Sequence, residues 1–230
     1  MNSHVIRRPL LWSATQVIFY ATSPIQRIFS QPVITHNFCN EAAIEILKKD
    51  GFTSLGNLVE GYLTKLNKGS QWADSGWKNI THFLNPETKS GLSYFPDARF
   101  FYLKYYLEAK KAWSQGDRDK AFFFLGAATH LVQDMCVPHH VLGHLFEGHS
   151  KFENWAEEHR SQFLVENEGI YEKKRSPGGW LTDNAKRALE FDYLVKDEKE
   201  VHYREATKVL LALAQRTSAG FLKDFLEERY

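Results

Sequence analysis

From residue 34 onward, apolar residues recur at the three- and four-residue spacing that predicts helices with one buried face. The clearest stretch runs from Arg118 to about Met135, where Ala, Phe, Leu and Val fill nearly every position. A helix that is apolar almost all round belongs at the centre of a bundle, so we predict that this helix is the central one. Asp117 is placed to cap its first turn, and Pro138 ends it.

The same reasoning predicts four further helices. One is capped by Asn40, one follows Asp97 and runs to about Trp113, and two cover about 150–165 and 201–228. Glycine, proline and asparagine predict loops over 68–95 and 138–148, and loops this long are more often functional than incidental. Because no β-hairpin or βαβ pattern appears, the predicted fold class is an all-α multi-helix bundle.

Residues 1–33 show no pattern that assigns an element to them. We therefore expect an N-terminal segment, 1–33, of undetermined structure and one helical domain, 34–230. Arg7 and Arg8, followed by 9–22, loosely resemble a signal peptide, but polar residues and the lack of a small-x-small cleavage site weaken that interpretation. The stretch is also too short and too polar to span a bilayer, so no transmembrane segment is expected.

Charge and cysteine content exclude several classes of site. The net charge is only +1, from 29 basic and 28 acidic residues, which argues against stable binding of nucleic acid and against electrostatic docking on anionic lipid. There are two cysteines, Cys39 and Cys136, and no C-x-x-C motif, so a cysteine zinc knuckle is excluded. Two buried thiols are favoured over a disulfide.

Histidine is the residue type that points to chemistry, since six of the ten histidines lie between positions 130 and 159. His130 and Asp134 are four residues apart on the predicted central helix, so both side chains lie on one face. His149 and Glu153 repeat this spacing at the start of the next helix. Together, two such pairs separated by a short loop predict a metal site more strongly than either pair alone.

The loop between the two pairs offers a further ligand, His140, with His139 and His144 as alternatives. A carboxylate and an imidazole on an apolar helix cost several kcal/mol when buried, unless a partner compensates them. Zinc is the natural partner, because histidine nitrogen and carboxylate oxygen are its preferred ligands other than thiolate. The alternatives are a buried hydrogen-bonded pair at His130 and Asp134 and a solvated surface pair at His149 and Glu153.

These motifs resemble the zinc-dependent phospholipases C of bacteria, a family related to zinc-dependent single-strand nucleases. The resemblance covers roughly 34–230. It rests on the run Ala121-Phe-Phe-Phe-Leu-Gly, on His130, Asp134, Pro138, His140 and His149-Ser-Lys-Phe-Glu153, on His82-Phe-Leu-Asn-Pro and Tyr94-Phe-Pro96, and on Ala214-Gln-Arg-Thr-Ser-Ala-Gly-Phe221.

The resemblance implies a helical bundle that encloses a multinuclear zinc site with two or three ions. One zinc would be held by Asp74, His82, His130 and Asp134, a second by His140, His149 and Glu153, and a third by His36 with Asp134 bridging. Asp74 is also the candidate general base. Its spacing to His82 is shorter than the family pattern, and a solvated turn carboxylate is an equal alternative for it.

One feature departs from the family pattern. Relatives complete the third zinc site with the amine and carbonyl of an N-terminal Trp, whereas here the only Trp before His36 is Trp12, preceded by eleven residues. Either the chain is processed before Trp12, or another group fills this position, or the third zinc is absent.

The activity implied by the resemblance is hydrolysis of a phospholipid into diacylglycerol and a phosphorylated head group, by a monomer that contacts the membrane surface transiently. The resemblance also favours a secreted or extracytoplasmic location. If His36 and Asp134 share one zinc, Cys39 and Cys136 come close enough for a disulfide to stay an alternative. Two other functions stay open. One is a single-strand nuclease, which would carry Asp in place of Glu153, and the other is a non-catalytic, zinc-stabilised binding domain.

Overall fold

The computed structural model describes residues 34–92, 95–143, 148–172 and 178–228, so the predicted N-terminal segment, Trp12 and His144 lie outside the described residues. The regular elements of the described chain are helices, and the one β-pairing there is an isolated bridge between Asn85 and Ser90. The predicted all-α fold class is confirmed. The helices are α2 Ile34–Lys49, α3 Thr53–Gly61, α4 Leu63–Asp74, η1 Gly76–Thr81, α5 Ala98–Ser114, α6 Arg118–Asp134, α7 Pro138–Leu142, α8 His149–His159, η2 Arg160–Phe163, α9 Gly179–Leu189, α10 Asp192–Val195 and α11 Glu200–Glu227.

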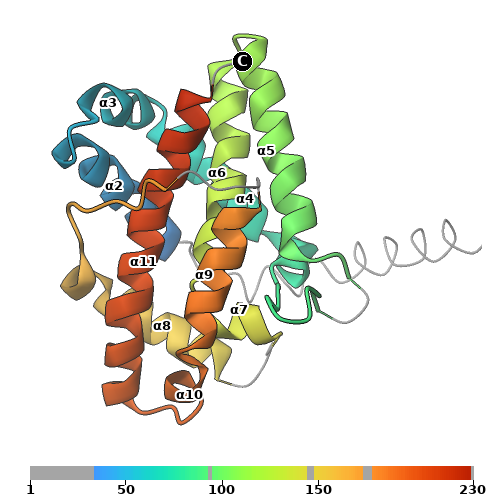
Figure 1. Cartoon of the computed structure of the whole chain (residues 1–230), viewed down its shortest axis with the longest axis vertical. Helices are drawn as coiled ribbons and strands as arrows, with labels where there is room; N and C mark the ends of the chain where they lie inside the picture. Colours follow the sequence, from blue (N-terminus) through green and yellow to red (C-terminus); the bar gives the residue numbers. More distant parts are fainter. Residues whose placement is uncertain (1–33, 93–94, 144–147, 173–177, 229–230) are drawn as a thin grey trace, which may run out of the picture.

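Helix α6 is the central helix, as its apolar sequence predicts. It packs against α4, α5, α9 and α11, and Figure 1 shows it between α5 and α11. Its second half, from Leu125 to Asp134, is buried on every side. The Asp117 side chain caps the helix by accepting a hydrogen bond from the Lys120 amide at 3.0 Å. Asp97 caps α5 in the same way, through the Arg99 amide at 2.9 Å.

Helices α4 and α6 touch through two glycines that leave no space for a side chain. A Cβ atom on Gly126 would lie 1.9 Å from the Leu66 carbonyl oxygen, and one on Gly69 would lie 1.8 Å from the Phe123 carbonyl oxygen. Backbones can approach this closely only where Cβ is missing. The contact carries the end of α4, and with it Asp74, to the face of α6 that bears His130.

The predicted loop over 68–95 is wrong in its first half. Helix α4 continues to Asp74, and the 3₁₀ helix η1 follows it. Gly69 lies inside helix α4, where the missing Cβ lets two helices touch. Leu66 and Ala73, both completely buried, fix α4 to the core. The predicted loop over 138–148 likewise begins with a short helix, α7, which has Pro138 in its first turn.

The predicted cap at Asn40 is also wrong. Helix α2 begins six residues earlier, at Ile34, and Asn40 lies buried inside it. Its side chain donates to Asn67 Oδ1 at 2.9 Å and to Ser70 Oγ at 3.3 Å on α4. A buried tertiary partner has therefore replaced the local capping role of this residue.

The two cysteines are free thiols, in agreement with the favoured interpretation. Cys39 and Cys136 are buried in one small apolar cluster with Leu211 and Ala214. Burial raises the pKa of the Cys39 thiol to about 12. Among the described residues, no helix is both long and apolar enough to cross a membrane.

We predict that Gly126→Ala destabilises the protein by about 1–3 kcal/mol, because the added methyl group forces α4 away from α6. Urea unfolding followed by circular dichroism measures the loss. Gly61→Ala is the matched control, since a Cβ there meets nothing within 4 Å, and it should leave stability nearly unchanged. Equal effects of the two substitutions would contradict a tight contact at Gly126.

Candidate metal centre

The eight side chains predicted as metal ligands come from distant parts of the chain and gather at one end of α6. Helix α6 supplies two of them, one turn apart, and the segment after it supplies three more through α7 and α8. The first turn of α2, the last residue of α4 and the residue after η1 supply the others. In chain order they are His36, Asp74, His82, His130, Asp134, His140, His149 and Glu153.

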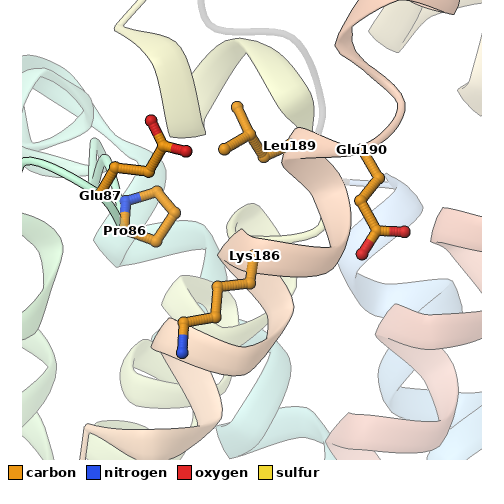
Figure 2. Close-up of a pocket in the computed structure, with 5 residues that line it drawn as sticks. All are labelled: Pro86, Glu87, Lys186, Leu189 and Glu190. Atoms are coloured by element: carbon orange, nitrogen blue, oxygen red, sulfur yellow. The ribbon is translucent and has the colours of Figure 1, made fainter.

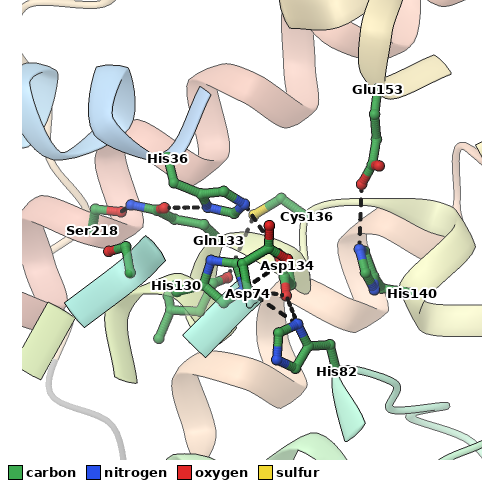
Figure 3. Close-up of polar contacts among 12 residues, drawn as sticks. His36, Asp74, His82, His130, Gln133, Asp134, Cys136, His140, Glu153 and Ser218 are labelled. Carbon is green, nitrogen blue, oxygen red and sulfur yellow. Dashed lines mark hydrogen bonds and ion pairs between the residues drawn. The ribbon is translucent and has the colours of Figure 1, made fainter. Parts of the chain in front are cut away.

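Asp134 lies at the middle of the larger group, and three imidazoles face its carboxylate (Figure 3). Its Oδ2 lies 2.9 Å from His82 Nδ1 and 3.1 Å from His130 Nε2. Its Oδ1 lies 3.4 Å from His36 Nε2. The two carboxylate oxygens thus face different histidines, so Asp134 could share in holding more than one ion.

Asp74 joins this group from the side of α4. Its Oδ1 lies 3.8 Å from His130 Nε2, which is itself 3.2 Å from His82 Nδ1. The Asp74 side chain is 32% exposed, whereas that of Asp134 is only 3% exposed. Asp74 is therefore the carboxylate of this group that a substrate or solvent water can reach.

A second group forms where α7 meets α8. Glu153 Oε1 lies 2.9 Å from His149 Nε2 and 3.3 Å from His140 Nε2. The neighbouring His139 takes another position, because its ring stacks on that of His149 with centroids 5.1 Å apart. Of the alternatives left open by the sequence, the structure thus brings His140, and not His139, to the ligand position.

The spacing of these atoms fits zinc. Four ligand atoms about 2.1 Å from one ion, in tetrahedral geometry, lie about 3.4 Å from one another. The ligand atoms of each group lie within 4.8 Å of one another, and the nitrogen–oxygen pairs in direct contact are 2.9 to 3.8 Å apart. Each group combines imidazole with carboxylate. Two imidazole nitrogens as close as those of His82 and His130 repel unless a proton or a cation lies between them.

The surroundings favour a neutral His130 imidazole and ionised Asp134 and Glu153 carboxylates, which are the forms that bind metal. Burial lowers the pKa of His130 to about 4, although the charge of Asp134 opposes the shift. Burial resists the ionisation of Asp134, but His130, His140 and His82 outweigh it and hold its pKa well below the usual range. The pKa of Glu153 is also lowered, because the attraction of His149 and His140 outweighs the opposing effect of burial.

A separate pocket lies on the surface, away from both groups (Figure 2). Its lining contains none of the eight candidate ligands. It consists of Pro86, Glu87, Lys186, Leu189 and Glu190. We assign no role to it.

A comparison with protein families matches residues 35–223 to the zinc-dependent phospholipase C model. The chain belongs to the zinc-dependent phospholipase C family. The resemblance stated from the sequence is thereby confirmed. The match covers most of the chain and includes all eight residues of the two groups.

Two curated relatives in this family are bacterial phospholipases C. One, from Clostridium perfringens, is 26% identical over 178 residues, which are 64% of this chain and 44% of that protein. The other, from Listeria monocytogenes, is 26% identical over 221 residues, covering 83% of this chain and 76% of the relative. The chain therefore spans less than half the length of the clostridial relative.

A solved structure supports the fold independently. The alpha-toxin of an avian strain of Clostridium perfringens superposes with a TM-score of 0.74 at 22% identity, over 86% of this chain and 64% of the toxin chain. At 22% identity this similarity supports the fold alone, and it agrees with the helical bundle described above.

All eight residues predicted as ligands lie within the two groups, whereas the alternatives His144 and Trp12 fall outside the described residues. Their roles as ligands, and the number of ions, stay predictions. Gln133, which no sequence pattern singles out, contacts His36 through its side chain in the buried layer behind the larger group. A glutamine on an apolar helix does not indicate a metal site, because its amide is not a typical zinc ligand. The position of Gln133 next to Asp134 is the one sequence feature that could have pointed to its role.

We predict that the metal-free protein loses stability as the pH falls from about 6.5 to 4. The unfolded chain binds a proton at His130 near its ordinary pKa of about 6.5, while the folded chain does so only at about 4. The unfolded state thus holds more protons in this window, and stability falls with pH.

Urea unfolding in a chelator across this pH range measures the effect, with His130→Gln as comparison. The wild type should lose about 1–3 kcal/mol more than the variant between the two limits. Parallel curves for the two proteins would contradict a neutral, buried His130.

Proposed function

We propose that this chain is a zinc-dependent hydrolase that cleaves the phosphodiester bond of phospholipids, giving diacylglycerol and a phosphorylated head group. The observation that carries the proposal is the gathering of eight imidazole and carboxylate ligands in two neighbouring groups at one end of the bundle. The family match and the names of the curated relatives support the same reaction class.

The two groups suit this reaction because they lie close together and hold ligands of the kind that zinc prefers. When bound, clustered zinc ions supply Lewis acidity, which lowers the pKa of a coordinated water and stabilises negative charge on the phosphoryl oxygens. The chain itself contributes the fixed geometry. Asp134 and His130 are rigid because they lie on the buried face of the central helix, and Glu153 and His149 lie one turn apart on α8.

Asp74 is the group that we assign to proton transfer. It is the more exposed carboxylate of the larger group and ends α4, beside His130. A carboxylate at the solvent side of the site can accept a proton from the attacking water, and the buried Asp134 is enclosed by imidazoles that keep it from doing so. Asp74 thus has two proposed roles, as a ligand and as a general base.

The substrate is best tested with zinc-loaded protein on phosphatidylcholine vesicles and, in parallel, on single-stranded DNA. We expect release of a phosphorylated head group and diacylglycerol, complete loss of activity in a chelator, and recovery when zinc is added. Cleavage of DNA alone would identify a nuclease. Bound zinc with hydrolysis of neither substrate would identify a non-catalytic, zinc-stabilised domain.

The role of Asp74 is tested by Asp74→Asn, which keeps a ligand oxygen and the side-chain size but no longer accepts the proton. We expect activity to fall by about 10²- to 10⁴-fold, while most of the zinc stays bound by elemental analysis. Asp119→Asn, at an exposed carboxylate of α6 that pairs with Lys65, is the matched control and should keep full activity. Retained activity in Asp74→Asn would overturn the assignment.

A further inference from the structure

Gln133 lies directly before Asp134 on α6 and is buried, with 3% of its surface exposed. Its side chain points toward His36, at the edge of the larger ligand group (Figure 3). The His36 Nδ1 atom lies 2.7 Å from Gln133 Oε1, while its other nitrogen, Nε2, lies 3.4 Å from Asp134 Oδ1. Two consecutive residues of α6 thus face the two ring nitrogens of His36.

The amide of Gln133 has one favourable orientation, and its neighbours on α11 determine it. Gln133 Nε2 donates to Ser218 Oγ at 2.9 Å. The Ser218 hydroxyl donates its own hydrogen to the Ala214 carbonyl at 2.7 Å. The oxygen of Ser218 can therefore only accept at Gln133, so the amide nitrogen, and not the amide oxygen, must lie on this side.

Asn40 imposes the same orientation from the side of α2. Its amide nitrogen donates to Asn67 and Ser70 on α4, and the Ser70 hydroxyl lies 3.0 Å from the Gly126 carbonyl, to which it donates. The remaining atom of Asn40, Oδ1, accepts from Gln133 Nε2 at 2.9 Å. With both hydrogens of its amide used, Gln133 offers only its oxygen to His36, and His36 Nδ1 must carry a hydrogen.

We propose that Gln133 is a positioning residue, which holds His36 in the tautomer with hydrogen on Nδ1 and directs the lone pair of Nε2 toward Asp134. This inference rests on the zinc site proposed above. A metal-binding histidine is generally oriented by an acceptor at its second nitrogen, which fixes the tautomer and the direction of the ring. His36 needs such an anchor because its side chain is 20% exposed and lies in the first turn of its helix.

Three variants separate this role from a merely structural one. Gln133→Met keeps the volume but removes the acceptor. Gln133→Glu keeps an acceptor oxygen toward His36 and loses the two amide hydrogen bonds. Ser218→Ala removes a partner of the amide but leaves the bond to His36 in place. Thermal unfolding of each variant checks that it is folded.

Zinc binding is the first readout, measured with zinc alone by titration against a chelating indicator. We expect Gln133→Met to bind the weakest wild-type ion about 10- to 100-fold less tightly, with Gln133→Glu and Ser218→Ala close to the wild type. Wild-type affinity in Gln133→Met, or an equal loss in Ser218→Ala, would overturn the proposal.

The second readout needs no metal. Nitrogen-15 NMR of the imidazoles in chelated protein at about pH 8 reports which ring nitrogen carries hydrogen. We expect Nδ1–H for His36 in the wild type and in Gln133→Glu, and its loss in Gln133→Met. An Nε2–H form in the wild type would overturn the proposal.

The two readouts keep this inference distinct from the proposed function. If the wild type bound no zinc, the proposed metal site would fail, while the tautomer of His36 would still decide the role of Gln133. If the wild type bound zinc and Gln133→Met did so equally well, only the positioning role would fail.

Discussion

Burial of the Asp134 carboxylate is the constraint on which the rest of this site depends. A carboxylate inside an apolar bundle is costly unless positive charge or hydrogen-bond donors surround it. Imidazoles from three different segments, those of His36, His82 and His130, lie within 3.4 Å of the carboxylate oxygens. Imidazole nitrogen and carboxylate oxygen are ligand types that zinc prefers, so a zinc ion held by this proposed site would also compensate the buried charge.

The packing of the helices brings the side chains of this site together. Gly69 and Gly126 let α4 and α6 touch, and the end of α4 thereby reaches the face of α6 that bears the candidate ligands. Behind that face, a layer of amides and hydroxyls joins α2, α4, α6 and α11 and ends at backbone carbonyls. A buried polar layer costs free energy unless every donor and acceptor in it has a hydrogen-bond partner. A layer in which all of them are paired is rigid. The ligands therefore project from a frame that has few alternative arrangements.

The two ligand groups differ in ways that matter for chemistry. The larger one is built around a buried carboxylate and holds one accessible acid, Asp74, at its edge. The smaller one, with His140, His149 and Glu153, lies nearer the surface, since the Glu153 side chain is 43% exposed. A substrate phosphate that contacts both groups would meet a rigid, buried set of ligands on one side and a more open set on the other. This asymmetry is compatible with a substrate that enters from solvent and with products that leave toward it.

The sequence by itself predicted the central helix, the helical fold class and the two helical pairs of candidate ligands, His130 with Asp134 and His149 with Glu153. It could do so because apolar periodicity and four-residue spacing are local properties of a helix, whereas His36, Asp74 and His82 were predicted from the resemblance to the zinc-dependent phospholipases C. The close contact of α4 with α6 could not be foreseen, because a glycine in a sequence looks the same whether it breaks a helix or lets two helices touch. Asn40 and Gln133 became informative only in three dimensions, because a hydrogen bond between residues 93 positions apart has no local signature. The tertiary structure also decided between His139 and His140, since the backbone of α7 directs two adjacent side chains to different neighbours.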